Sequence, residues 1–256
     1  YPGAMRETVE TATEAPCLFL LGASGDLGPR DGYVGDLAVA DRNGRQLGHA
    51  ALAALESLPP PDCEYVYQGP VLSGATIGVW NYEPIAEAAR TNAARWQHRR
   101  VTVELPYRDD LPTVEVAQAE LARRQQAEEA ARSSGNATTA AEMRALAERA
   151  RRQLTRLRSL PQGKAFSYQV DLLRLGDAVW LAVEGEPYNL LQRELRQRLP
   201  DVPLIVSVLA GGWRPAYLPT RDAYGKGIYQ ETVAVLAPGS LETLIERVAA
   251  EIGRIL

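Results

Sequence analysis

Three places in this sequence combine residue types and spacings that are suited to chemistry. A Gly-rich turn from Gly22 to Gly28 follows an apolar run, and such a turn either cradles a phosphate or carries catalytic groups at the mouth of a hydrolase. Glu184 and Glu186 end a second apolar run just before a helical segment, a position where α/β folds commonly place functional groups. The Gly- and Pro-rich stretch 211–229 gathers three tyrosines and has the composition of a pocket wall.

The turn from Gly22 to Gly28 resembles the Gly-Ala-Ser-Gly-Asp-Leu turn of glucose-6-phosphate dehydrogenases. A dinucleotide pyrophosphate needs a helix directly after such a turn, whose N–H groups and dipole hold the anion. Here Gly32 and Gly35 would interrupt that helix. Asp41, near the expected distance for a ribose ligand, falls in or near the next helix rather than at a strand end. An NADP-binding oxidoreductase is therefore a less favoured alternative.

A lipase-type nucleophile elbow is the second alternative for this turn, because Ser24 follows the apolar run. The spacing is Gly22-x-Ser24-Gly25 rather than Gly-x-Ser-x-Gly. The only histidines are His49, on an expected helix, and His98, in a basic stretch. We interpret both as ordinary surface or groove histidines rather than catalytic bases.

Taken in order, the turn, the Gly-Glu dipeptide and the tyrosine loop resemble the neutral (non-lysosomal) ceramidase family and its bacterial ceramidase-like relatives. In that family a Gly-Asp-x-Ser-Pro-Asn turn follows a strand, a Gly-Glu dipeptide ends another strand, and a Tyr-x-Thr-Thr loop precedes a second Tyr. The matching stretches here are Gly25 to Arg30, Gly185-Glu186, and Tyr217 to Thr220 followed by Tyr229. The resemblance spans nearly the whole chain.

The resemblance implies a zinc-dependent hydrolase of N-acyl amide bonds that uses metal-activated water. It implies that Glu186 and Tyr217 bind the catalytic zinc and that Tyr229 hydrogen-bonds the developing oxyanion. Asp26 and backbone N–H groups of the turn would form one wall of the site. The implied substrate is a small molecule or a lipid, with ceramide suggested by the family alone.

The serine of the family falls on Gly28, which has no side chain. Ser24, four residues earlier, is a candidate substitute. Hydrolysis by metal-activated water does not require the serine, so an active enzyme is expected. A catalytically inactive ceramidase-like binding protein is the alternative that Gly28 favours.

The resemblance also implies that two histidine ligands of the zinc come from a part of the fold that precedes this chain. Two protein ligands are too few for a tight zinc site. We therefore expect this chain to be the C-terminal portion of a catalytic domain, and to associate with an N-terminal segment of the same protein. Family members are often exported, which suggests a secreted or periplasmic location.

Bulk composition sets broad limits on the partners. The chain has 256 residues, of which 46% are hydrophobic and 23% charged, as expected for a single ordinary globular domain. A net charge of -4 gives no general attraction to nucleic acid, and no apolar run reaches the length of a membrane span. Two cysteines provide neither a disulfide framework nor a Cys-based zinc motif.

The patterning predicts an α/β domain with a layered mixed β-sheet flanked by helices, because strands and helices interleave. Two Ala-, Arg- and Glu-rich segments within 113–160, separated by Ser133 to Asn136, predict an inserted charged αα-hairpin. The other expected helices are Ala4–Thr13, one from Asp41 or Arg45 through Leu55, Ile85–Trp96, Tyr188–Leu199 and Ser240–Leu256. The expected strands are Ala15–Leu21, Glu64–Gln68, Val101–Leu105, Phe166–Leu173, Ala178–Val183 and Pro203–Leu209.

Overall fold

The computed structural model describes residues 1–256. Its helices are α1 (Pro2–Thr13), α2 (Leu37–Glu56), α3 (Glu87–Ala93), α4 (Val114–Ser133), α5 (Ala137–Ser159), α6 (Leu190–Arg198), α7 (Tyr229–Val233) and α8 (Ser240–Ile255), with a 3-10 turn at Arg221–Ala223. Its strands are β1 (Cys63–Leu72), β2 (Thr76–Pro84), β3 (Trp96–Pro106), β4 (Ala165–Leu175), β5 (Ala178–Val183), β6 (Glu186–Pro187), β7 (Leu204–Ser207) and β8 (Tyr217–Leu218). None of the helices combines the length and apolar character that a membrane span requires.

A four-stranded sheet in the order β3-β4-β5-β7 forms the centre of the fold. The first two pairings are antiparallel, whereas β5 and β7 are parallel and are connected through α6. Buried side chains alternate along β4, with Phe166, Tyr168, Val170 and Leu172 directed into the core. The expected α/β architecture with a mixed sheet is confirmed.

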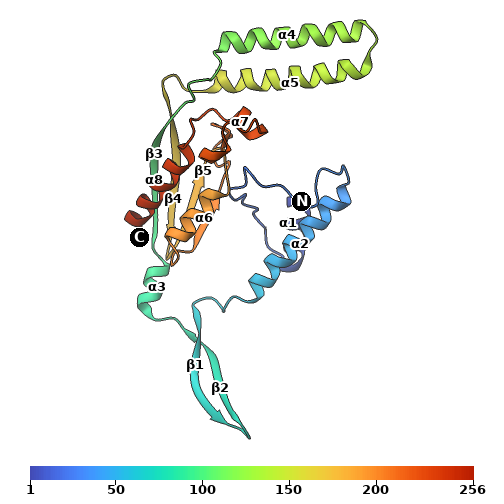
Figure 1. The fold of residues 1–256 in the computed structure, drawn as a ribbon. Coiled ribbons are helices and arrows are strands. Elements are labelled where there is room, and N and C mark those ends of the chain that lie inside the picture. Colours follow the sequence, from blue (N-terminus) through green and yellow to red (C-terminus); the bar gives the residue numbers. More distant parts are fainter.

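Helix α8 supplies much of the core on the covered face of the sheet. It packs against α6 and β3 (Figure 1). Its apolar stripe repeats at helical spacing and is fully buried, and it comprises Leu241, Leu244, Ile245, Val248 and Ile252. Full burial of each aliphatic side chain contributes roughly 1.5–3 kcal/mol, so this stripe anchors the C-terminal helix to the sheet.

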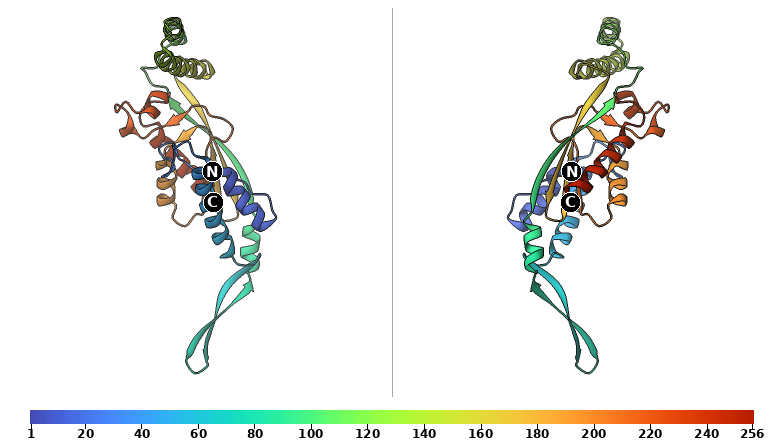
Figure 2. Two further views of the ribbon diagram at one scale, coloured as in Figure 1. Left: turned by 90° about the vertical axis from the view of Figure 1, so that its right-hand side faces the viewer. Right: turned by 90° about the vertical axis from the view of Figure 1, so that its left-hand side faces the viewer.

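The αα-hairpin is inserted between β3 and β4, and extends from one end of the sheet (Figures 1 and 2). The Thr113 hydroxyl accepts a hydrogen bond from the Val116 N–H at the start of α4. The Asn136 side-chain oxygen accepts one from the Thr139 N–H at the start of α5. These caps satisfy N–H groups that a helix start leaves unpaired, and the prediction of a helical hairpin within 113–160 is confirmed.

Helices α1 and α2 form a separate pair on the N-terminal side of the molecule. Their close approach depends on Gly44 and Gly48, because a β carbon at Gly48 would lie 2.7 Å from Cβ of Thr8. Helix α2 begins at Leu37, earlier than the expected start at Asp41 or Arg45. The reason is Asp36, whose carboxylate accepts a hydrogen bond from the Ala38 N–H and caps the helix.

The expected strand Ala15–Leu21 is wrong. This segment belongs to no strand, and Leu18 is exposed. Its link to the sheet region is a single hydrogen bond from the Val208 N–H to the Leu21 carbonyl, at 2.8 Å. An apolar run becomes a strand only where another strand pairs with it, and this segment lacks a continuous partner.

The region between α2 and β3 also differs from expectation. The short strand expected at Glu64–Gln68 is one arm of a β1–β2 hairpin that projects from the end opposite α4 and α5 (Figure 1). Cross-strand aromatic contacts support it: the ring centroids of Tyr65 and Trp80 are 5.5 Å apart. Helix α3 is shorter than predicted, since Trp96 already begins β3.

Candidate functional site

The structure brings Glu186 and Tyr217 together through a short parallel pairing of β6 with β8. The two residues are direct partners in this register, and the Glu186 N–H donates to the Ala216 carbonyl at 2.8 Å. The next residues continue the pairing, with the Tyr188 N–H donating to the Leu218 carbonyl. Two residues that are far apart in the sequence are therefore fixed side by side by backbone hydrogen bonds.

Gly185 makes this pairing sterically possible. Its φ of +64° lies in the left-handed region, and a β carbon there would approach the Ala216 carbonyl oxygen to 2.5 Å. Ala216 itself has a φ of +76°, which is uncommon for a residue with a side chain. The sharp turn after β5 thus requires the glycine of the Gly-Glu dipeptide.

The Glu186 carboxylate contacts the Trp213 indole and lies near the Tyr217 phenol. The Trp213 indole Nε1–H donates to Glu186 Oε1 at 2.6 Å. Burial, together with the nearby Glu186 carboxylate and the Tyr229 phenol, raises the pKa of Tyr217 to about 12. At neutral pH the Tyr217 phenol therefore keeps its proton beside Glu186, unless a positive charge is added to this group of oxygens.

Tyr229 stands at the start of α7, close to Tyr217. The two ring centroids are 6.0 Å apart and the rings are nearly perpendicular. The loop before α7 is closed by Glu231, whose carboxylate accepts hydrogen bonds from the backbone N–H groups of Gly225, Lys226 and Gly227. These bonds lower the pKa of Glu231 and fix the loop that leads to Tyr229.

The turn from Gly22 to Gly28 packs against the same two-residue strand. The Gly25 N–H donates to the Pro187 carbonyl at 3.0 Å, and a β carbon at Gly25 would lie 2.4 Å from the Glu186 carbonyl oxygen. Asp26 accepts a hydrogen bond from the Asn189 N–H at 2.6 Å, at the start of α6. No helix follows the turn before Leu37, so the helix that a pyrophosphate needs is absent.

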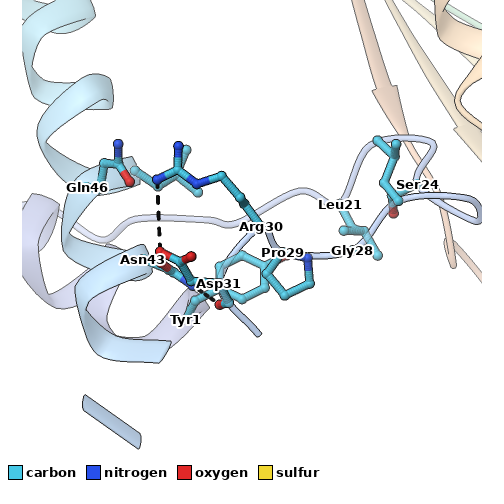
Figure 3. A pocket seen from close by; sticks show the side chains of 11 residues that line it. Tyr1, Leu21, Ser24, Gly28, Pro29, Arg30, Asp31, Asn43 and Gln46 are labelled. Carbon is cyan, nitrogen blue, oxygen red and sulfur yellow. Dashed lines mark hydrogen bonds and ion pairs between the residues drawn. The ribbon is translucent and has the colours of Figure 1, made fainter. Parts of the chain in front are cut away.

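Ser24 and Gly28 lie on the other side of this turn, in the wall of a pocket of about 430 Å³ between the turn and α2 (Figure 3). Tyr1, Asp31 and Asn43 also line the pocket, and the Asn43 amide donates to the Asp31 carbonyl at 2.8 Å. Glu186, Tyr217 and Tyr229 do not line it. The sequence-predicted residues thus occupy two neighbouring regions.

Gly28 is nevertheless adjacent to a phenol. A β carbon on Gly28 would lie 3.4 Å from the hydroxyl of Tyr33, an ordinary contact distance. Tyr33 in turn contributes to the raised pKa of Tyr217. The Tyr33 side chain itself is almost fully exposed.

Glu184 and the histidines belong to other parts of the surface. Burial raises the pKa of Glu184, while Arg214 and Arg100 act in the opposite direction. His98 lies within hydrogen-bonding distance of Asp171, at 2.7 Å, on strands β3 and β4. His49 lines a shallow pocket between α1 and α2. Neither histidine is part of the Glu186 group.

The structure places the two predicted metal ligands side by side. Glu186 and Tyr217 provide two neighbouring oxygen donors, which are acceptable zinc ligands. No group of three or more His, Cys, Asp or Glu side chains is arranged to hold a metal ion. These residues therefore fit part of a zinc site, and a complete site needs donors beyond those present here.

Sequence patterns do not identify two residues of this region as functional candidates. Trp213 is one aromatic residue in a loop, and only the fold shows that its indole holds Glu186. Arg156 is one of many arginines in the charged hairpin, but it is buried, and its guanidinium carbon lies 5.3 Å from the centroid of the Trp213 ring. Periodicity around Arg156 indicates a solvated helix, so the sequence offers no means of singling it out.

The sequence matches no family model and no curated protein. Among solved structures, a neutral ceramidase from Pseudomonas aeruginosa matches this chain with a TM-score of 0.45 and 12% sequence identity. The match covers 97% of this chain and 39% of that chain. This chain thus spans well under half the length of the protein it matches.

Proposed function

We propose that this chain carries part of the active site of a zinc-dependent hydrolase of N-acyl amide bonds, of ceramidase-like type. The observation that carries the proposal is the β6–β8 register, which makes Glu186 and Tyr217 direct neighbours, with Tyr229 stacked edge-on beside them. Sequence resemblance selects the same three residues. Their convergence from segments about 30 residues apart in the chain supports a shared task.

Each residue has a distinct task in this proposal. Glu186, oriented by the Trp213 indole, and Tyr217 provide oxygen ligands. The Tyr229 hydroxyl donates a hydrogen bond to the carbonyl oxygen of the substrate as negative charge develops on it. When bound, zinc supplies Lewis acidity at the carbonyl and a nucleophile derived from water near neutral pH.

The remaining zinc ligands are proposed to be histidines on a polypeptide segment outside this chain. Two observations support this: no group of three or more His, Cys, Asp or Glu side chains forms here, and His98 and His49 lie away from Glu186. The backbone of Gly28 takes the place of the family serine, so the proposed reaction does not use a serine nucleophile. The substrate class is an N-acyl amine, either soluble or lipid.

The test combines metal content with hydrolysis, using the complete protein. Glu186→Gln and Tyr217→Phe are expected to lower bound zinc, measured by mass spectrometry of the purified protein, and to abolish hydrolysis of N-acyl substrates. Glu184→Gln is the matched control, because this carboxylate is only two residues away but faces Arg214 and Arg100. Unchanged zinc content in Glu186→Gln, or equal losses in Glu184→Gln, would contradict the proposal.

A catalytically inactive binding protein is the second candidate, and Gly28 is the observation that favours it. An inactive relative would bind N-acyl ligands without turnover. Tyr229→Phe separates the two candidates, because loss of an oxyanion donor lowers kcat by roughly 100- to 1,000-fold and leaves ligand binding largely intact. Absence of turnover in the zinc-loaded wild-type protein, together with ligand binding, would establish the inactive alternative.

A further inference from the structure

Arg156, near the end of α5, is a buried cation without an anionic partner. The residue is 8% exposed, and its Nε–H is enclosed without any hydrogen-bond acceptor. Burial lowers the pKa of its guanidinium, and the Tyr229 phenol acts in the opposite direction. No carboxylate compensates this charge, although the hairpin around it contains many glutamates.

The position of Arg156 joins the helical hairpin to the proposed site. Its guanidinium lies over the face of the Trp213 ring, and the edge of the same ring donates to Glu186. Arg214 strengthens this connection by donating to the Ser159 carbonyl at the end of α5, at 3.0 Å. Arg156, Trp213 and Glu186 thus form a continuous chain of contacts.

The contact with Trp213 does not satisfy the guanidinium. A cation over an aromatic face gains less free energy than the burial of an unpaired charge costs. Stacking also uses only the face of the guanidinium and leaves its N–H donors, which lie in the plane, without an acceptor. Those donors form a fork that matches a carboxylate or a phosphate in bidentate geometry.

We propose that Arg156 binds an anionic group, a carboxylate or a phosphate, on the substrate of the neighbouring site. This inference rests on the proposed function and narrows its substrate class. The preferred substrates are N-acyl amines with an acidic head group, rather than neutral N-acyl amines. The αα-hairpin contributes to specificity through this one residue, while its outer face remains solvated.

The test compares three dodecanoyl amides on the complete protein: N-dodecanoylglycine, N-dodecanoyl phosphoethanolamine and the neutral N-dodecanoylethanolamine. Equilibrium binding is measured by calorimetry, and kcat/KM is measured in parallel. Wild-type protein is expected to prefer one or both anionic compounds. Arg156→Met should weaken binding of the preferred anion by roughly 30-fold or more, with little change for the neutral compound.

Arg149→Met is the matched control, because Arg149 lies about two turns earlier on α5 and is exposed. It should leave all three ligands unaffected. Arg156→Lys keeps the charge but removes the planar fork, and should give an intermediate loss. Because it alters the core least, it also serves if Arg156→Met does not fold.

Measuring binding and turnover separately tests the anion-binding role of Arg156 independently of the proposed hydrolase function. Selective anion binding that depends on Arg156 supports the inference even if none of the compounds is hydrolysed, in which case only the proposed function fails. Hydrolysis with equal preference for the neutral compound, or anion binding unchanged in Arg156→Met and Arg156→Lys, overturns the inference. The glycine and phosphoethanolamine derivatives distinguish a carboxylate from a phosphate ligand.

Discussion

Glu186 and Tyr217 are direct partners in a parallel pairing that is only two residues long on each strand. Such a short pairing has little stability of its own, so the turn that precedes Glu186 must hold the register. Gly185 forms that turn. Its left-handed backbone and close approach to the Ala216 carbonyl leave no space for a β carbon.

Gly185→Ala is therefore expected to disrupt the β6–β8 pairing. The alanine would be strained at a positive φ and would collide with backbone, so the free energy of unfolding should fall by more than about 1 kcal/mol. Urea unfolding and zinc content measure the two effects. Gly212→Ala is the control, since the nearest atom to its β carbon would be 4.0 Å away; comparable losses in both variants would argue against the register explanation.

Glu231 provides a second prediction, on the position of Tyr229. Glu231→Gln removes one of the two equivalent oxygens that accept from the Gly225 and Gly227 N–H groups. The loop before α7 should loosen, and kcat should fall by up to roughly 100-fold through misplacement of Tyr229. Zinc content should remain unchanged. Glu246→Gln, at an exposed position of α8, should have wild-type kcat.

The third prediction is that Asp171 makes part of the free energy of unfolding depend on pH. Burial raises its pKa, but hydrogen bonds from Arg100 and His98 outweigh burial and lower it below the ordinary value. A lowered pKa in the folded state stabilises the protein above the unfolded-state pKa of about 3.9, and this stabilisation is lost as pH falls through the folded pKa.

Asp171→Asn should accordingly lower the free energy of unfolding by about 1–2 kcal/mol at pH 7. The difference from wild type should shrink as the pH falls below about 4. Urea unfolding between pH 3 and pH 7 measures this difference, with Glu104→Gln on the exposed side of β3 as a control. A difference of constant size across this range would refute the ion-pair explanation.

The contact between α1 and α2 gives the fourth prediction. Gly48→Ala would normally favour a helix, but here the new β carbon meets Thr8, so we expect a net loss of roughly 1–3 kcal/mol. Gly253→Ala in α8 is the matched comparison, because its β carbon would meet nothing within 4 Å. That variant should gain about 0.5–1 kcal/mol. Thermal unfolding of both proteins is the measurement, and stabilisation by Gly48→Ala would be inconsistent with close helix packing.

Local sequence patterns predict the parts of the fold whose burial repeats regularly. The helical hairpin, α8 and the β4–β5 pairing all have strong periodicity or a turn such as Gly176-Asp177. The other elements depend on whether a segment finds a partner strand, which local sequence patterns do not reveal. Leu18 belongs to an apolar run that lacks a partner strand, and Trp80 belongs to a strand whose signal depends on cross-strand aromatic neighbours.

The candidate site likewise contains residues that the sequence predicts and residues that only the fold identifies. Glu186, Tyr217 and Tyr229 stand in stretches with recognisable neighbours, so sequence reasoning selects them. Arg156 and Trp213 acquire importance only through contacts between segments that are at least 27 residues apart in the sequence. No pattern within α5 distinguishes a buried arginine from a solvated one.

Gly25 shows how a glycine signature can arise without any ligand. Its hydrogen atom fills the only space available between two crossing backbones, because a β carbon would lie 2.4 Å from the Glu186 carbonyl oxygen. Motif searches that score glycine spacing alone would assign this turn to nucleotide recognition. A simple geometric filter separates the two cases: in a phosphate-binding turn the missing side chain leaves room for a ligand, whereas at Gly25 it leaves room for the protein itself.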